Sequence, residues 1–237
     1  MTPGRVVAVE GASAAGKTTA AETAARARGW VVIPEAYRRL HPTPSLTYRS
    51  PTELLDLERT LLEEEARRFS EARARARSGA TVLADTGFLG PLTYTWALIG
   101  MGAAPTATLP SLLQLARTLG ARGEWGLADA YVYVDTPPSV RSARARADRV
   151  GHPSDVAARH AAVGALERRF YRERFAPLVG SRLTWLAGSG RPALVAERVQ
   201  HAVETASGSR FPPEQVDRVL ALFEDLGPGP PPARGNR

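Results

Sequence analysis

The sequence predicts an α/β fold, in which one five-stranded parallel sheet carries helices on both of its faces. Three observations predict it. Five short apolar segments alternate with longer segments of helical periodicity. The first apolar segment runs directly into a glycine-containing loop and then into a helix. Acidic residues stand at the ends of four of these segments, where a parallel sheet collects its ligand-binding groups: Glu10, Glu35, Asp85 and Asp135.

The elements follow one another in a regular order along the chain. The strands are expected at 5–10, 30–33, 80–85, 130–135 and 182–187. The helices are expected at 18–29, 51–78, 91–122 with an interruption at 100–110, 137–149, 154–175, 191–206 and 212–226.

The helix at 51–78 has the clearest start signal. Ser50 is a good N-cap, Pro51 suits the first turn, and Glu53 completes a capping box. Leucines and Phe69 give it one apolar stripe. Three pairs spaced four residues apart are expected on its solvated side: Glu63/Arg67, Glu64/Arg68 and Glu71/Arg75.

The chain divides into three parts by composition. Residues 1–206 form the predicted main domain, with an arginine-rich lid at about 141–155. Residues 207–226 are expected to be a linker followed by a helix that docks on the main domain. Residues 227–237 are rich in proline and glycine, and we expect them to be disordered.

Composition excludes several classes of site. The chain has 237 residues, of which 43 % are hydrophobic, and it contains no cysteine, so disulfides and thiolate metal sites are excluded. The first apolar run is the predicted strand at 5–10, so neither a signal peptide nor a membrane span is expected, and the cytoplasm is the expected location.

The charge is strongly basic, with a formal net value of +7. Because the arginines are scattered through alanine-rich helices among glutamates, we favour a solvated basic surface over a nucleic-acid interface. Long helices such as 51–78 are compatible with a homodimer.

The loop after the first strand has the spacing of a phosphate-binding loop. Gly11 is followed by four small residues, Gly16, Lys17 and Thr18, and Lys17 is the only lysine of the chain beside thirty arginines. A compact ammonium fits such a loop and reaches the β- and γ-phosphates, whereas a guanidinium would crowd it. We therefore expect ATP to be bound by Gly11, Ala12, Ser13, Ala14, Ala15, Gly16, Lys17, Thr18 and Thr19.

Two further residue types fit a phosphate-transfer site. Thr18 follows the loop lysine and Asp85 ends an apolar strand, so both are expected to hold Mg²⁺, Asp85 directly or through water. The alternative for Asp85 is a cap for the next segment.

Glu35 follows the second strand immediately, which predicts a carboxylate in the cleft that accepts the proton of an attacking hydroxyl. The alternative is a surface glutamate paired with Arg38 or Arg39. Those two arginines have the alternative role of gripping an acidic or phosphorylated acceptor. Tyr37 is placed either against a substrate ring or in the core.

The helix at 137–149 carries Arg141, Arg144, Arg146 and Arg149. Arginines that close over ATP stabilise charge on the transferring phosphoryl group. Arg144 and Arg146 lie about 160° apart on a helix, so at most two or three of the four reach the site. The alternative is a soluble basic helix.

Three segments together resemble the P-loop kinases of the thymidylate kinase and deoxynucleoside kinase group. They are "VEGASAAGKTT", "IPEAYRRL" and "YVYVDTPPSVRSARARADR", and the resemblance covers about residues 5–205. It implies the P-loop NTPase fold, a place for Glu10 in the magnesium shell and the role of base for Glu35. The group usually has Asp-Arg or Glu-Arg-Ser after the third strand, whereas this chain has Thr86 where the arginine would stand; "DT" is more similar to ribosylnicotinamide kinases.

These features favour a kinase that phosphorylates a hydroxyl of a nucleoside-like or antibiotic small molecule. One alternative is a nucleoside monophosphate kinase, with Arg38, Arg39 and Arg49 gripping the acceptor phosphate. The other, of a different class, is an NTP-hydrolysing switch whose helix at 212–226 contacts a partner.

Overall fold

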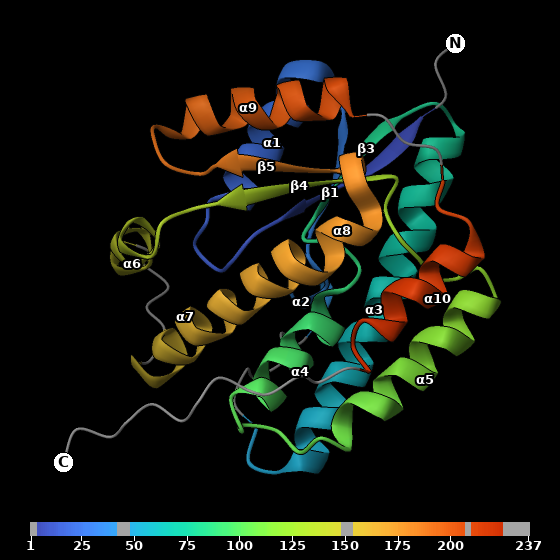
Figure 1. Cartoon of the computed structure of the whole chain (residues 1–237). Coiled ribbons are helices and arrows are strands. Elements are labelled where there is room, and N and C mark those ends of the chain that lie inside the picture. Colours follow the sequence, from blue (N-terminus) through green and yellow to red (C-terminus); the bar gives the residue numbers. More distant parts are fainter. Residues whose placement is uncertain (1–3, 42–47, 148–153, 207–209, 225–237) are drawn as a thin grey trace.

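The computed structural model describes residues 4–41, 48–147, 154–206 and 210–224. Its centre is a sheet of five parallel strands in the order β2-β3-β1-β4-β5 (Figure 1). The predicted five-stranded parallel sheet is therefore confirmed. The strands are β1 (Arg5–Glu10), β2 (Val31–Ile33), β3 (Thr81–Asp85), β4 (Ala130–Asp135) and β5 (Leu183–Ala187).

Most of the predicted helices begin within two residues of the predicted position. They are α1 (Lys17–Arg28), α2 (Ala36–Arg39), α3 (Pro51–Arg77), α4 (Gly90–Gly100), α5 (Thr108–Ala121), α6 (Pro138–Ala147), α7 (Ser154–Arg169), the π-helical segment η1 (Phe170–Phe175), α8 (Ala176–Val179), the short 3₁₀ helix η2 (Gly180–Arg182), α9 (Pro192–Thr205) and α10 (Pro213–Ala221).

Helices cover both faces of the sheet, as predicted. Helices α1 and α9 pack together on one face, over a core of small residues and valines. Helices α3, α4, α5 and α7 lie on the other face, with a larger core that contains most of the aromatic residues (Figure 1). The central strands β1, β3 and β4 are buried from both sides, which explains their continuous apolar sequence.

The register brings the ends of β1, β3 and β4 to one edge. Val9 pairs with Asp85, and Glu10 pairs with Tyr133. The loop after β1, the turn after β3 and the helix after β4 therefore all leave the sheet at the same place, where parallel sheets bind ligands.

Helix α3 begins as predicted, because the Oγ of Ser50 accepts a 3.2 Å hydrogen bond from the Glu53 amide. The expected solvated pair Glu64/Arg68 is wrong, whereas Glu63 and Arg67 are exposed as expected. Arg68 is fully buried and pairs with Glu65 instead of Glu64, while Glu64 pairs with Arg67. The physical reason is that α3 packs against the sheet and also against α4 and α5, so more than one stripe of the helix is covered.

The C-terminal helix α10 packs against α5, and the residues after it reach η1. The ring of Phe223 stacks on Phe170 with 4.6 Å between centroids. Nε2 of Gln215 donates to the carbonyl of Leu178 over 3.1 Å. These contacts agree with a docking helix. Residues 207–209, part of the expected linker, and the tail 227–237 lie outside the described residues, so the division into domains stays a prediction.

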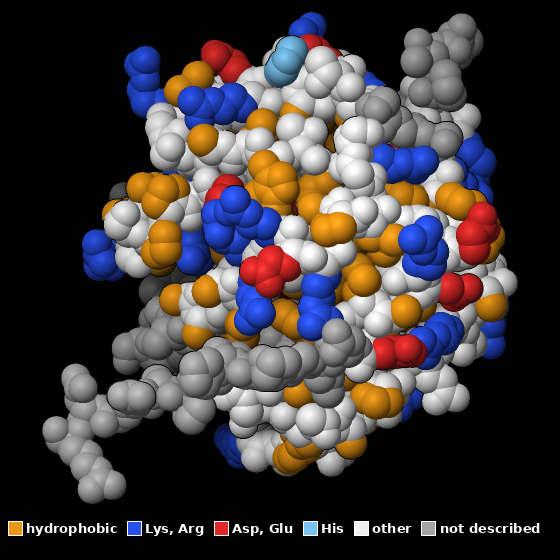
Figure 2. Space-filling model, viewed as in Figure 1, with side chains coloured by type: hydrophobic (Ala, Val, Ile, Leu, Met, Phe, Trp, Pro, Cys, Tyr) orange, Lys and Arg blue, Asp and Glu red, His pale blue; other side chains and the backbone are white. Residues whose placement is uncertain are grey.

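None of the helices in the described ranges has the length and apolar character that crossing a bilayer requires. On the face that Figure 2 shows, basic side chains are spread over the surface with acidic side chains among them. That distribution agrees with the solvated basic surface expected from the sequence.

Candidate active site

The loop between β1 and α1 has the backbone of a phosphate cradle. Gly11 (φ 138°) and Gly16 (φ 94°) take conformations that favour glycine, and Ala14 is left-handed at φ 59°. A Cβ on Gly11 would lie 2.6 Å from the carbonyl oxygen of Val134. Nζ of Lys17 donates to the carbonyls of Gly11 and Ala12, over 2.8 and 3.2 Å, so the ammonium lies across the mouth of the loop.

Thr18 and Asp85 meet directly beside this lysine. The hydroxyl of Thr18 donates a 2.6 Å hydrogen bond to Oδ2 of Asp85. Asp85 is 1 % exposed, and its Oδ1 has no hydrogen-bond partner among the described residues. Burial raises the pKa of Asp85, and the Thr18 hydrogen bond and the charge of Lys17 oppose that rise.

These two side chains fit Mg²⁺ in their chemistry. A hydroxyl and a carboxylate are hard oxygen ligands, and the buried Oδ1 of Asp85 is an orphaned acceptor beside the phosphate loop. The described residues contain no group of three or more His, Cys, Asp or Glu side chains able to hold a metal ion. Such sparse ligation is typical of Mg²⁺ sites that complete their shell with water and substrate phosphates.

Glu10 is the last residue of β1 and is 3 % exposed. Its Oε1 accepts a 2.9 Å hydrogen bond from the amide of Gly87, and a Cβ on Gly87 would lie 2.2 Å from that oxygen. Burial raises the pKa of Glu10, while a hydrogen bond from Tyr171 and the charge of Lys17 oppose that rise. Glu10 is thus held by protein donors and fixes the turn after β3.

Arg68 is a site residue that the sequence analysis missed. From α3, its Nη2 donates to the carbonyls of Asp85 (2.8 Å) and Thr86 (3.0 Å), where Thr86 has a left-handed φ of 63°. The carboxylate of Glu65 pairs with the same guanidinium. An arginine from another element therefore supports the turn in which the sequence has Thr86 in place of arginine. Its spacing gave no signal, since it matched a surface pair.

Glu35 lies at the N-terminus of α2, directly after β2. Its Oε1 accepts a 2.8 Å hydrogen bond from Nε of Arg38, and its side chain is 32 % exposed. Its negative charge contributes to the raised pKa of Asp85, so the two carboxylates lie within electrostatic range of each other. The glutamate is thus paired with Arg38 and also within electrostatic range of Asp85.

The two arginines beside Glu35 have different partners. Arg39 binds Glu64 and Glu71 of α3, over 2.8 and 2.7 Å, and is thereby turned away from the loop. Tyr37 is partly buried on α2. Of this group, Glu35 and Arg38 are the side chains that the structure brings near Asp85.

One of the predicted lid arginines contacts the phosphate loop. Arg144 donates to the carbonyl of Ala15 over 2.6 Å and to that of Gly188 over 3.0 Å. Arg146 is exposed on α6, and Arg149 lies outside the described residues. A cavity of about 390 Å³ opens beside Arg144, and its lining comes from the loop, α1, α6 and α9: Ala14, Ala15, Gly16, Thr19, Ala20, Arg144, Ala145, Ala147, Pro192 and Val195.

Helix α7 also reaches the site. A Cβ on Gly164 would lie 2.7 Å from Cβ of Ala12, so α7 touches the loop at that point. Asp135, expected at the ligand edge, accepts two hydrogen bonds from Arg168 of α7, over 2.8 and 2.7 Å, and this partner lowers the pKa of Asp135. These contacts could not be predicted from local sequence patterns, because they join segments far apart in the chain.

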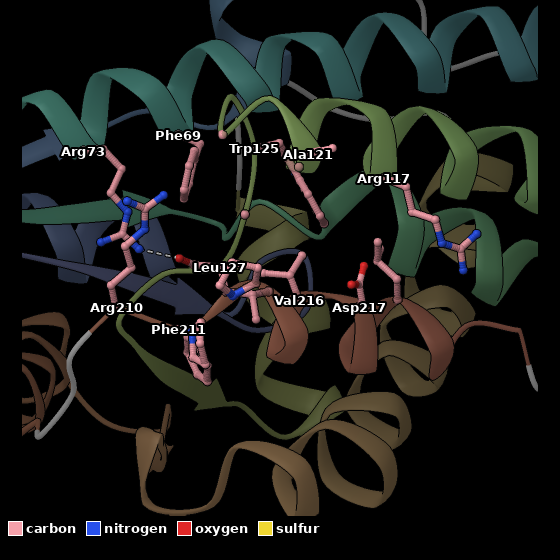
Figure 3. A pocket seen from close by; sticks show the side chains of 16 residues that line it. Phe69, Arg73, Arg117, Ala121, Trp125, Leu127, Arg210, Phe211, Val216 and Asp217 are labelled. Atoms are coloured by element: carbon pink, nitrogen blue, oxygen red, sulfur yellow. Dashed lines mark hydrogen bonds between the residues drawn. The ribbon is translucent and has the colours of Figure 1, made fainter.

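A second cavity, of about 470 Å³, lies away from the phosphate loop (Figure 3). It is enclosed by α3, α5, the segment that leads into β4 and the start of α10. Arg73 on its wall is paired with Asp129 and donates to the carbonyl of Leu127, while Arg117 is paired with Glu224. None of the predicted site residues lines this cavity.

Comparisons with known proteins agree with this geometry. Residues 6–173 match the AAA_28 family, described as an AAA domain. No curated protein matches the chain. Among solved structures, deoxyadenosine kinase from M. mycoides with bound dATP is similar with a TM-score of 0.61 and 11 % identity, over 84 % of this chain and 100 % of that one. The same kinase with the products dCMP and a flexible dCDP gives 0.60 and 11 %, over 84 % and 99 %. At this identity the likeness establishes the fold, and the predicted P-loop NTPase fold is confirmed.

Proposed function

The chain belongs to the AAA_28 family of AAA domains, and from that premise we propose that it is an ATP- and Mg²⁺-dependent phosphotransferase. It moves the γ-phosphate of ATP to a hydroxyl of a nucleoside-like or antibiotic small molecule. The observation that carries the proposal is the meeting of Lys17, Thr18 and Asp85 at one end of the sheet, with Glu35 in electrostatic range. The likeness to a deoxyadenosine kinase supports the same reaction class.

The nucleotide is held by the loop and α6. The backbone amides of the loop and the positive end of α1 receive the phosphates. Lys17 exchanges its two carbonyl partners for the β- and γ-phosphates. Arg144, which donates a hydrogen bond to the carbonyl of Ala15, pairs with the negative charge of the phosphates. The cavity of about 390 Å³ between the loop, α6 and α9 receives the base.

The hydroxyl of Thr18 and the carboxylate of Asp85 would hold Mg²⁺, which neutralises charge on the phosphates when bound. The hydrogen bond between these two side chains keeps them beside the lysine in the absence of nucleotide. Glu10 accepts a hydrogen bond from the amide of Gly87 and so fixes the turn after β3.

Glu35 accepts the proton of the attacking hydroxyl. It lies at the end of β2, next to the strand that ends in Asp85, and it is exposed enough to meet a substrate. Nε of Arg38 donates a 2.8 Å hydrogen bond to Oε1 of Glu35 and so orients the carboxylate. Arg39 has no comparable position, since its guanidinium is engaged by α3.

The test is Mg²⁺-ATP consumption with and without pooled acceptors, followed by product mass. The pool contains nucleosides, nucleoside monophosphates and hydroxylated antibiotics. A mass gain of one phosphate on a hydroxyl compound is the expected result. A gain confined to the monophosphates would instead support a nucleoside monophosphate kinase. ATP hydrolysis at a rate that no compound of the pool changes would overturn the proposal in favour of an NTP-hydrolysing switch.

A further inference from the structure

Three polar side chains without a role in phosphate binding gather between α3, α4 and α7. Glu58 of α3 is 2 % exposed, and its Oε2 has no hydrogen-bond partner among the described residues. The hydroxyl of Tyr94 of α4 is also buried without a partner in the same described part. Buried polar groups are normally satisfied, because each one left unpaired costs about 1–3 kcal/mol. An unpaired carboxyl oxygen and an unpaired hydroxyl in one place point to a ligand that supplies their partners.

Glu167 of α7 connects this cluster to the phosphate loop. Its carboxylate interacts electrostatically with Lys17 and Glu10 on one side and with Glu58 on the other. Helix α4 packs against both α3 and α7, and Figure 1 shows α4 and α7 next to each other at this end of the molecule. Lys17, Glu167 and Glu58 therefore form a row that leads from the site of the transferred phosphate into the helical layer.

At the inner end of the row, the charge that acts on Glu58 within the described residues is negative. Burial raises the pKa of Glu58 to about 8 and that of Glu167 to about 7. Glu167 is the described charge that acts on Glu58, and it raises the pKa further. Arg159 lies on the other side of the cluster, over the ring of Tyr48 at 5.3 Å from its centroid, and acts on Tyr48 and Tyr94.

We propose that Glu58 and Glu167 bind a positively charged nitrogen of the phosphate acceptor, so that the substrate is a hydroxyl compound that carries a cationic group. This inference rests on the proposed kinase function. A cation between the two carboxylates gives the Glu58 oxygen a charge-assisted partner and allows both acids to ionise. A neutral ligand offers hydrogen bonds but no positive charge that favours ionisation, so Glu58 keeps its proton.

The first experiment uses matched acceptors in the Mg²⁺-ATP assay. An aminoglycoside is compared with its fully N-acetylated form, and a nucleoside with a quaternised base is compared with its neutral parent. We expect phosphate transfer to the cationic members, with kcat/KM lower by about 100-fold or more for the neutral ones, as removal of one partner of a buried charge pair predicts. Equal or better transfer to the neutral members would overturn the inference and leave the kinase function standing. No transfer to any member would overturn the function and the inference with it.

The second experiment uses Glu58→Gln with Glu63→Gln as the matched control, because Glu63 is an exposed glutamate on the same helix. Glu58→Gln should raise the KM for the cationic acceptor by about ten-fold or more, while the KM for its neutral counterpart changes little. Glu63→Gln should change neither. A Glu58→Gln variant with an unchanged preference for the cation would overturn the inference.

The third measurement follows protons during binding of the cationic acceptor, by calorimetry in two buffers of different ionisation enthalpy at pH 7. The titratable and charged groups that face the cluster are Glu58, Tyr48, Tyr94, Arg159 and Glu167. On the side of the loop and of β4 they are Glu10, Lys17, Arg141, Tyr133 and Tyr171. Cation binding should release protons from the two carboxyls, and Glu58→Gln should reduce that release. Binding without proton release would contradict the proposed contact.

Discussion

The hydroxyl of Thr18 donates a 2.6 Å hydrogen bond to Oδ2 of Asp85 and so joins the first turn of α1 to the end of β3. The contact leaves Oδ1 of Asp85 buried and unpaired among the described residues. A buried acceptor that lacks a protein donor is destabilising unless an ion, water or substrate completes it. Stability and function therefore make opposite demands on Asp85, and this opposition can be measured.

Asp85→Asn should lower kcat by about 100-fold or more, because the proposed metal-ligand position is lost. The same change should stabilise the protein. The pKa of Asp85 is raised in the folded state, so the folded protein binds that proton more tightly than the unfolded chain, and ionisation of Asp85 costs stability as pH rises through the raised pKa. Removing the charge should raise Tm at pH 8 by about 2–4 °C, equivalent to about 1 kcal/mol. Thermal melts and initial rates at pH 8 test both parts; a lower Tm with retained turnover would contradict them.

Glu35→Gln tests the proposed role of Glu35 as the base. We expect kcat to fall by about 100- to 10,000-fold, the range for a general base, with the KM for ATP nearly unchanged because Glu35 lies outside the phosphate loop. Glu63→Gln, an exposed glutamate of α3, is the control and should keep full activity. If Glu35→Gln turned over as fast as the wild type, the base would have to be removed from the mechanism.

The fold and the loop could be predicted from the sequence because both depend on local patterns. Strand and helix periodicity, the Ser50 cap and the glycine spacing each act within a few residues of the chain. The predicted sheet is confirmed by the observed strand order, and the predicted loop is confirmed by the backbone conformations of Gly11 and Gly16.

The rest of the site depends on contacts between distant segments. Arg68 has the spacing of a solvated helical pair with Glu64, yet it donates to the carbonyls of Asp85 and Thr86. Periodicity alone does not distinguish an arginine on a wet face from one that satisfies buried carbonyls, since the difference lies in what packs on α3. Glu58 was hidden for the same reason: it interrupts an apolar helix face whose partner helices are set by the tertiary structure.

Gly164→Ala should reverse the usual sign of a glycine-to-alanine change in a helix. Such a change ordinarily stabilises a helix interior by about 1 kcal/mol. Here the new Cβ would lie 2.7 Å from Cβ of Ala12 in the phosphate loop and 3.1 Å from Nη1 of Arg141, so we expect a loss of about 1–3 kcal/mol and weaker ATP binding. Gly100→Ala in α4 is the control, because its nearest neighbour is Leu166 at 3.6 Å and it should not destabilise. Denaturant unfolding and ATP titration measure both effects, and a stabilised Gly164→Ala protein would show that α7 does not press on the loop.

Arg144 and Arg146, two arginines of the predicted lid, should differ in effect. Arg144→Ala removes hydrogen bonds to the loop carbonyl of Ala15 and to Gly188, so we expect both a higher KM for ATP and a lower kcat, each by about ten-fold. Arg146→Ala, from an exposed position on the same helix, should change either constant by less than about two-fold. Steady-state kinetics at saturating acceptor distinguish the pair. The reverse ranking would place the lid differently around ATP.

Glu58→Gln should change the pH dependence of stability in a defined window. The carboxyl has an ordinary pKa of 4.5 in the unfolded chain and about 8 in the folded protein. Between these values the folded state keeps a proton that the unfolded state has lost, so this one group makes the free energy of unfolding fall by about 1.4 kcal/mol per pH unit, and the fall stops above about pH 8. The variant lacks the group, so its Tm should exceed that of the wild type by an amount that grows from pH 5 to pH 8 and then stays constant. Thermal melts across pH 5–9 test this, with Glu63→Gln as an exposed control that should follow the wild type throughout. A Tm difference that does not depend on pH would mean that Glu58 is ionised in the folded protein at neutral pH, with a partner that compensates its burial.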